Sequence, residues 1–199
     1  QQVVEAVMRV APVLPVKFGT QAPDETSVRH ALEQGRSSYQ EAFARLADCM
    51  QMEVVVLWDL DAVFRDIAAE GAIVQLKSEI AASPEQQREA ACVTLGGLVK
   101  AALDRRRREL ATHLADALRG VAIDAVDNAV MNDRMVLNLA LLLRRNDGER
   151  LDRRLSELDA EHVGRLTFRC VGPLPPYSFA TVEIRFPTFD EVERSRRAL

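Results

Sequence analysis

Residues 52–58, MEVVVLW, are the most strand-like stretch of the chain. Short runs of β-branched and large apolar residues are typical of buried strands. Residues 134–143, RMVLNLALLL, predict a second buried strand, although their leucines would also suit a helix. Weaker strands are predicted at residues 121–123 and 166–171. Because central strands are the most continuously apolar, the two strong runs should occupy the middle of a sheet and the weaker ones its edges.

A long helix is predicted between the first strand and the second. Ser83 can be its N-cap, Pro84 its first residue and Gln86 the reciprocal partner of a capping box. The helix should run to about Arg119. The pair Gly96–Gly97 lowers its helix propensity, which close packing against another element would offset.

From residue 52 onward the predicted order is therefore strand, helical region, strand, strand, helix, strand. This is the order of the split βαβ, ferredoxin-like fold, so the chain belongs to the α+β class with a domain boundary near Gln51. Helices cover only one face of such a sheet. The apolar character of the central strands predicts that the N-terminal segment or a partner protein covers the other face.

The ends of the chain give weaker signals. Residues 1–10 have the periodicity of a short helix, and residues 13–20 alternate like a strand that prolines restrict to a sheet edge. A helix interrupted by Gly35 follows. Residues 182–186 predict a further short strand and residues 190–199 a short charged helix.

Composition excludes several classes of protein. Lysine and arginine number 26 against 30 aspartate and glutamate residues, and a formal net charge of −4 argues against a dedicated nucleic-acid binder. The longest apolar stretch, residues 135–143, is far shorter than the roughly 20 residues of a membrane helix. Cys49, Cys92 and Cys170 lie among apolar neighbours, so we expect buried free thiols in a reducing cytoplasm.

No motif predicts catalytic, cofactor-binding or metal-binding residues. His30, His113 and His162 are scattered and have no metal-ligand spacing, so each is expected to be a surface or hydrogen-bonded histidine. Asp59 and Asp61 could hold a metal, but capping of the helix that follows explains them at least as well.

One basic run occupies the long helix, where residues 105–108 are four consecutive arginines. Consecutive helical residues point around all sides of the helix, so the run cannot form one flat phosphate-binding face. We favour a solvated, salt-bridged face. The functional alternative is a surface for an acidic partner, with Arg105, Arg106 and Arg108 as the candidate partner-binding residues.

Two proline-containing motifs lie near the ends of the sequence: residues 12–20 read PVLPVKFGT, and residues 171–179 read VGPLPPYSF. Residues 56–59 (VLWD) and 135–138 (MVLN) lie between them. In this order and at this separation, the four segments resemble the GvpF/GvpL family of gas vesicle proteins. The resemblance covers essentially the whole chain.

The resemblance implies both a fold and a function. Residues 1–50 would be the C-terminal part of an N-terminal α+β domain whose opening strands are missing, and residues 51–199 a modified ferredoxin-like (βαββαβ) domain with a helical region at 61–119 and a tail at 172–199. The protein would be a non-enzymatic accessory or minor structural component, required for gas vesicle formation. It would bind the shell protein GvpA and other Gvp proteins during nucleation and assembly, at the gas vesicle or in the cytoplasm. No cofactor, small-molecule substrate, nucleic acid or membrane is implied.

Both motifs can also be interpreted physically. Proline rigidity and aromatic area in the second motif suit either a structural corner or a preformed docking surface. The candidate partner-binding residues there are Pro175, Pro176, Tyr177 and Phe179. The residues assigned a structural role are Leu14, Pro15, Phe18, Gly19, Gly172 and Pro173, with Phe18 packing inward and Gly19 permitting a turn.

Two alternatives of other classes remain open. A ferredoxin-like fold can host a small enzyme, which would need Asp59, Asp61 and a histidine to converge in one cleft. The same topology serves RNA-binding modules, but residues 166–171 lack the stacking aromatics of that class and the net charge is unfavourable.

Overall fold

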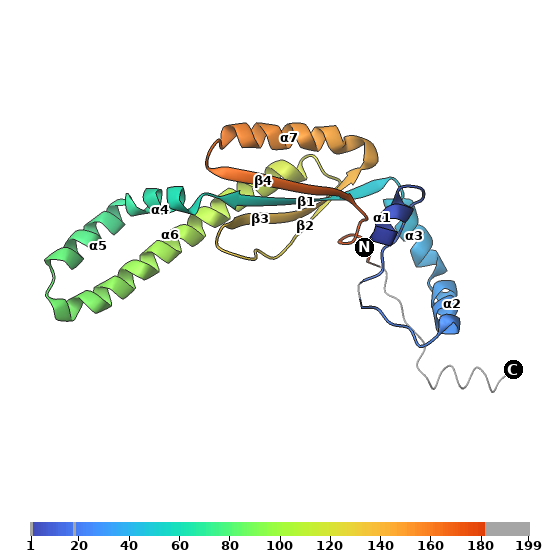
Figure 1. The fold of residues 1–199 in the computed structure, drawn as a ribbon, viewed down its shortest axis with the longest axis horizontal. Helices are drawn as coiled ribbons and strands as arrows, with labels where there is room; N and C mark the ends of the chain where they lie inside the picture. Colours follow the sequence, from blue (N-terminus) through green and yellow to red (C-terminus); the bar gives the residue numbers. More distant parts are fainter. Residues whose placement is uncertain (1, 18, 182–199) are drawn as a thin grey trace. The chain divides into compact units, whose positions relative to one another are not determined.

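The computed structural model describes residues 2–17 and 19–181 and contains helices and an antiparallel sheet (Figure 1). By contacts the chain separates into two compact units. One contains the described parts of Gln1–Met52, Leu142–Arg145 and Gly172–Leu199, and the other contains Glu53–Leu141 and Asn146–Val171. The division into domains at residue 50 stays a prediction.

The helices and strands follow in the order that the sequence predicts from residue 52 onward. The first unit contains α1 (Gln2–Met8), α2 (Glu25–Gln34) and α3 (Arg36–Leu46). The second contains α4 (Leu60–Ala68), α5 (Gly71–Ala82), α6 (Glu85–Arg119), β2 (Asp124–Asp127) and α7 (Gly148–Glu161). The remaining strands, β1 (Cys49–Trp58), β3 (Met135–Arg144) and β4 (Leu166–Leu174), cross the division, and a 3-10 turn spans Arg145–Asp147.

The sheet has the strand order β2-β3-β1-β4, so the two most apolar strands are central, as predicted. In β3, Leu139, Ala140 and Leu141 are all fully buried. Because successive residues of a strand face opposite sides, β3 is covered on both faces. In β1, Val54 and Val56 are fully buried but the intervening Val55 is only half-buried.

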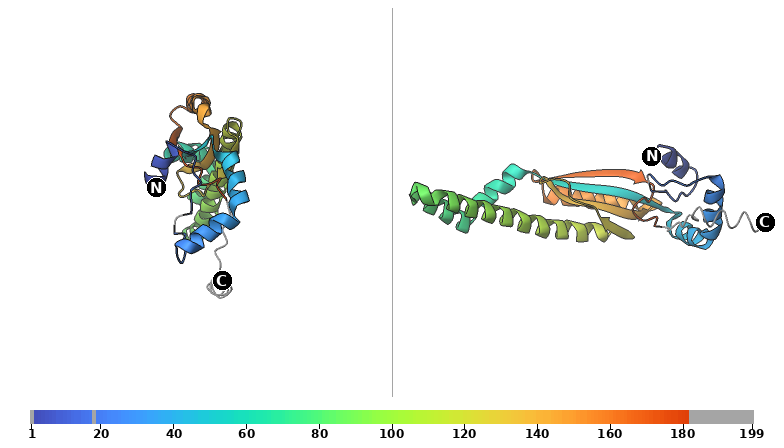
Figure 2. Two further views of the ribbon diagram at one scale, coloured as in Figure 1. Left: turned by 90° about the vertical axis from the view of Figure 1, so that its right-hand side faces the viewer. Right: turned by 90° about the horizontal axis from the view of Figure 1, so that it is seen from below.

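The helices of the second unit form two contacting groups. The helices α4 and α5 run back along the first half of α6, and both contact it (Figures 1 and 2). The second half of α6 contacts α7, and each helix contributes two fully buried leucines, Leu114 and Leu118 from α6 and Leu151 and Leu158 from α7. Burial of these side chains stabilises the unit by roughly 1.5–3 kcal/mol for each leucine.

The predicted capping box at the start of α6 is wrong. The Ser83 hydroxyl donates to the carbonyl of Glu79 at 2.7 Å, and α6 begins after Pro84 without a side-chain cap. Ser83 is the residue that ends α5. Its hydroxyl therefore satisfies one of the carbonyls that a helix end leaves without an intrahelical partner. The predicted end of α6 at Arg119 is confirmed.

The close packing that would offset Gly96 and Gly97 is not found among the described residues. A Cβ at either position would meet no atom within 4 Å among the described residues. Both glycines therefore reduce the helix propensity of α6 without a packing contact that offsets the loss.

We expect Gly96→Ala and Gly97→Ala each to stabilise the protein by about 1 kcal/mol, because alanine loses less backbone entropy in a helix interior. In thermal unfolding followed by circular dichroism, each change should raise Tm by about 2–4 °C. A lowered Tm would contradict the open space found around both glycines.

Other corrections concern local boundaries. Residues 13–17 and 19–20 form no strand, since Pro15 cannot donate to a sheet ladder. Gly35 separates α2 from α3 rather than lying within one helix. The edge strand β2 begins at Asp124, because residues 121–123 continue as turns from the end of α6. The predicted strand at 182–186 and helix at 190–199 lie outside the described residues.

Candidate functional site

The arginine run on α6 makes ion pairs with the neighbouring helices. Arg105 and Arg106 both reach the carboxylate of Glu70, at 3.1 and 2.9 Å, and Arg106 lies 3.7 Å from a carboxylate oxygen of Asp66. Asp66 lies on α4, and Glu70 is the residue before α5. Two of the candidate partner-binding arginines are thus engaged in holding the three helices together.

The other two arginines of the run lie in different surroundings. The Arg107 guanidinium lies over the Trp58 ring, 5.4 Å from its centroid, and donates to the Asp133 carbonyl at 3.1 Å. Arg108 is exposed. Of the candidate arginines 105, 106 and 108, Arg108 is therefore the one with a guanidinium available to a partner, and its binding role stays a prediction.

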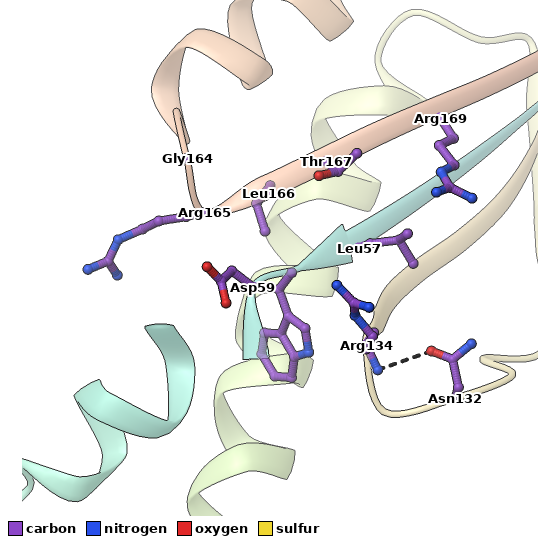
Figure 3. A pocket seen from close by; sticks show the side chains of 10 residues that line it. Leu57, Asp59, Asn132, Arg134, Gly164, Arg165, Leu166, Thr167 and Arg169 are labelled. Atoms are coloured by element: carbon purple, nitrogen blue, oxygen red, sulfur yellow. Dashed lines mark hydrogen bonds between the residues drawn. The ribbon is translucent and has the colours of Figure 1, made fainter. Parts of the chain in front are cut away.

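A polar hollow of about 410 Å³ lies where β1 ends and β3 and β4 begin (Figure 3). We call it the arginine hollow. Its lining residues are Leu57, Trp58, Asp59, Asn132, Arg134, Gly164, Arg165, Leu166, Thr167 and Arg169. In antiparallel neighbours, the end of one strand meets the start of the next, so these residues from distant parts of the sequence come together at one edge of the sheet.

The arginine hollow carries an excess of positive charge. Asp59 is its single acidic residue among three arginines, and the Asp59 carboxylate caps α4 by accepting from the amides of Asp61 and Ala62 at 2.9 and 3.2 Å. Arg165 pairs with Asp66 at 2.8 Å. In the described part of the chain, no acidic side chain pairs with Arg134 or Arg169, which leaves two guanidinium groups for an anionic ligand.

The predicted cap of α4 is confirmed, since Asp59 occupies the N-cap. The arginine hollow that Asp59 lines includes neither Asp61 nor a histidine. The convergence that a small enzyme would need is therefore not found there.

The second proline motif is buried only in its second half. Pro175 and Pro176 are buried and Phe179 is 5% exposed, whereas Val171, at 55%, and Tyr177, at 39%, are exposed. The Ser178 amide donates to Oε1 of Gln51, a fully buried residue, at 2.8 Å. These contacts suit a corner that packs within its own unit. A partner-binding role for the motif stays a prediction, for which Tyr177 offers the accessible atoms.

Tight packing also surrounds the start of this motif. Gly172 has φ +154° and precedes Pro173 through a cis peptide bond. A Cβ at Gly172 would clash with Sδ of Met52 and lie 3.0 Å from the carbonyl oxygen of Gln51. Glycine is therefore the residue that this backbone and this space accommodate.

The first motif forms an irregular segment. Leu14 and Pro15 are half-buried, and Phe18 lies outside the described residues. The Thr20 amide donates to the Lys17 carbonyl at 3.1 Å, and Gly19 has φ +84° in this turn. A positive φ at the third position is typical of a type II turn, which favours glycine there.

The three cysteines do not share one environment. Cys49 is buried, and burial raises the pKa of its thiol, so this thiol stays protonated at neutral pH. The prediction of burial is wrong for Cys92 and Cys170, which are exposed. Both cysteines have apolar neighbours in sequence, but Cys92 lies on the outer side of α6 and Cys170 on the edge strand β4. Apolar neighbours in sequence therefore do not ensure burial.

Sequence reasoning also missed one constellation. His113 of α6 lies beside Glu161 and His162 at the end of α7, and the three residues offer ligand atoms within 4.8 Å of one another. The two histidines are far apart in sequence on different helices, so no spacing rule reveals them. The third histidine, His30, makes a 2.8 Å hydrogen bond with Gln34, as expected for a surface residue.

A family model described as "Gas vesicle synthesis protein GvpL/GvpF" matches residues 1–181. The chain belongs to the GvpL/GvpF family. This membership confirms the family resemblance seen in the sequence and implies a role in gas vesicle formation.

Relatives named "Gas vesicle protein F" agree with the family assignment. The protein of Streptomyces sp. (strain CB03234) is 28% identical over 168 residues, covering 84% of this chain and 69% of its own length. That of Nostoc sp. (strain PCC 7120 / SAG 25.82 / UTEX 2576) is 22% identical over 172 residues, covering 85% of this chain and 70% of its own length.

The fold matches that of a solved GvpF. The crystal structure of the gas vesicle protein GvpF from Anabaena sp. PCC7120 superposes with a TM-score of 0.78 at 22% identity, covering 92% of this chain and 75% of that one. GvpL/GvpF membership thus rests on sequence, and the shared mixed helix and sheet architecture on structure. Within the described residues, no helix is both long and apolar enough to cross a membrane.

Proposed function

We propose that this chain is a non-enzymatic accessory or minor structural protein of gas vesicles that binds the shell protein GvpA and other Gvp proteins during nucleation and assembly. The observation that carries the proposal is the family match along residues 1–181. We place the protein in the cytoplasm and at the gas vesicle. A soluble factor that holds an apolar shell subunit needs recognition surfaces rather than a catalytic centre.

The arginine hollow is the recognition surface that we propose for an acidic segment of such a partner. Arg134 and Arg169 both line the hollow, exposed and without an acidic partner in the described chain, whereas Arg105 and Arg106 are paired with Glu70. Guanidinium groups bind carboxylates with two parallel hydrogen bonds, so two arginines lining one hollow favour an acidic stretch. Arg108 and Tyr177 are the further candidates for contact.

A pull-down of GvpA and the other Gvp proteins by the full chain tests this function. We expect the wild-type chain to capture GvpA, and the double change Arg134→Glu and Arg169→Glu to reduce capture by at least ten-fold, because each charge-assisted pair contributes roughly 1.5–3 kcal/mol. The matched control is Arg36→Glu with Arg153→Glu, which makes the same charge change at exposed positions on α3 and α7.

Two outcomes would contradict the proposal at different levels. If the control pair reduced GvpA capture as much as Arg134→Glu with Arg169→Glu, net charge and not the arginine hollow would govern binding. Failure of the wild-type chain to bind any Gvp protein, together with normal vesicles in a deletion strain, would overturn the assembly role itself.

We also propose that β1 to β4 with their helices form the ferredoxin-like domain. The order strand, helical region, strand, strand, helix, strand and the sheet order β2-β3-β1-β4 support this arrangement. The helices α4 and α5 and the first half of α6 would then be an insertion into its first helical connection. Superposition of a crystal structure on a ferredoxin-like domain is the direct test.

A further inference from the structure

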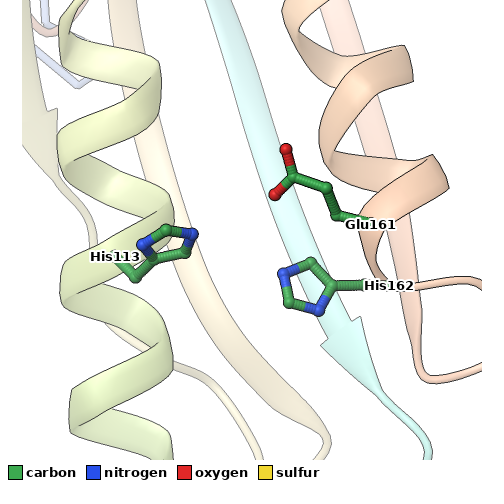
Figure 4. Close-up of side chains that lie close together, drawn as sticks. All are labelled: His113, Glu161 and His162. Atoms are coloured by element: carbon green, nitrogen blue, oxygen red, sulfur yellow. The ribbon is translucent and has the colours of Figure 1, made fainter.

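The histidine pair is built on two helices that contact each other. His113 projects from α6 toward the end of α7, where Glu161 and His162 face it (Figure 4). The imidazole centroids are 6.4 Å apart and their planes are inclined by 76°. The ligand atoms of the two rings and of Glu161 lie within 4.8 Å of one another, so a nitrogen of each ring can be directed at a common point.

His162 carries an unsatisfied polar atom. Its Nε2 is buried and has no hydrogen-bond partner among the described residues. A buried polar atom without a partner lowers stability, and such atoms in folded proteins are usually satisfied by a protein group, a water or an ion. The orphaned nitrogen therefore points, independently of the clustering, to a ligand at this place.

The electrostatic surroundings favour a cation. Glu161 is the last residue of α7 and His162 its C-cap, so both lie at the negative end of the helix dipole. The nearest competing cation is Arg154, whose Nη1 lies 2.8 Å from the Glu157 carboxylate but 4.0 Å from that of Glu161. The Glu161 carboxylate is thus only weakly engaged and remains free to coordinate.

We propose that His113, Glu161 and His162 bind one divalent transition-metal ion, and that Zn²⁺ is the ion the site suits best. Two imidazoles and a carboxylate are an established zinc ligand set, whereas Mg²⁺ and Ca²⁺ prefer sites made of oxygen atoms alone. The fourth position is left to water. The bound ion fastens α6 to α7.

The geometry requires only a small adjustment. Zinc–ligand distances of about 2.0–2.2 Å place tetrahedral ligand atoms roughly 3.3–3.5 Å apart. The three atoms now lie within 4.8 Å of one another, so they must approach by on the order of 1 Å. His113 and Glu161 are exposed and can rotate without disturbing the core.

Zinc titration of the full chain by isothermal calorimetry tests the site. Cys92→Ser and Cys170→Ser are introduced first, because exposed thiols also bind zinc. After treatment with EDTA and its removal, we expect one Zn²⁺ per chain, and at least ten-fold weaker binding after His113→Ala or His162→Ala. The matched control is His30→Ala, an exposed histidine of α2 outside the site, which should leave the affinity unchanged.

A second readout separates a specific site from loose surface binding. At a free zinc concentration of about 100 times Kd, the parent Tm should rise by roughly 5–10 °C, and His113→Ala should abolish the rise. Absence of saturable binding in the parent would overturn the proposal. The proposal would also be overturned if His30→Ala and His113→Ala lowered the affinity for Zn²⁺ equally. Glu161→Gln, which keeps the shape of the side chain, should weaken binding through loss of the charge alone.

Discussion

Trp58→Ala is expected to destabilise the protein by about 3–5 kcal/mol, among the largest effects of a single truncation in this chain. Trp58 ends β1 with only 3% of its surface exposed, and its indole Nε1 donates to the Asp133 carbonyl at 2.8 Å. The Arg107 guanidinium covers the ring at 5.4 Å. Truncation leaves a cavity and also removes a cation–π contact of roughly 0.5–1 kcal/mol.

Trp58→Phe is the informative companion. Phenylalanine keeps an aromatic ring beneath Arg107 but loses the hydrogen bond. Arg107 itself donates to the same Asp133 carbonyl at 3.1 Å, so that oxygen keeps a hydrogen-bond donor. The free energy of unfolding should therefore fall by only about 1 kcal/mol. Urea unfolding followed by far-UV circular dichroism measures both variants, since the chain has a single tryptophan and its fluorescence is lost. Equal losses in the two variants would show that burial of the ring contributes little.

Gly172→Ala is expected to destabilise the protein by about 2–6 kcal/mol. The φ of +154° lies where L residues are strained, which costs roughly 1–3 kcal/mol. The added methyl would also collide with Sδ of Met52 and approach the Gln51 carbonyl oxygen to 3.0 Å. The Met52 side chain can move, but the backbone oxygen cannot do so without displacing β1, so a further cost of about 1–3 kcal/mol follows from overpacking.

Gly19→Ala separates the cost of backbone strain from the cost of overpacking. Gly19 has φ +84°, and a Cβ there would meet no atom within 4 Å among the described residues. The substitution should therefore cost only the conformational term, about 1–2 kcal/mol. Urea unfolding of the two variants measures the difference. A loss for Gly172→Ala no greater than that for Gly19→Ala would mean that Met52 and Gln51 accommodate the methyl group.

The central strands could be predicted because their signal is local. Residues 52–58 and 134–143 are short, continuously apolar runs typical of buried strands, and β1 and β3 occupy the middle of the sheet. The end of α6 at Arg119 and the cap at Asp59 likewise depend on short-range pattern and backbone chemistry. The strand at 121–123 failed because turns at the end of α6 shifted pairing to Asp124.

The candidate site was less predictable. The sequence of a proline motif does not indicate whether its side chains are buried or exposed. Only the structure shows that Pro175, Pro176 and Phe179 are buried while Tyr177 is exposed. The arginine run indicated a charged surface, yet Arg105 and Arg106 find Glu70 on a neighbouring helix. No pattern indicated Arg134 and Arg169 together, since the hollow joins the starts of β3 and β4.

The sequence by itself determined the family, the α+β class, the central strands and the long helix, because these depend on periodicity, capping and motifs within short stretches. Only the tertiary structure decided which charges are neutralised, which cysteines are exposed, and that His113 meets Glu161 and His162. The physical reason is that ion pairing, burial and ligand geometry depend on distances across the packed chain. Residues some fifty positions apart come within ligand distance only after α6 and α7 have packed against each other.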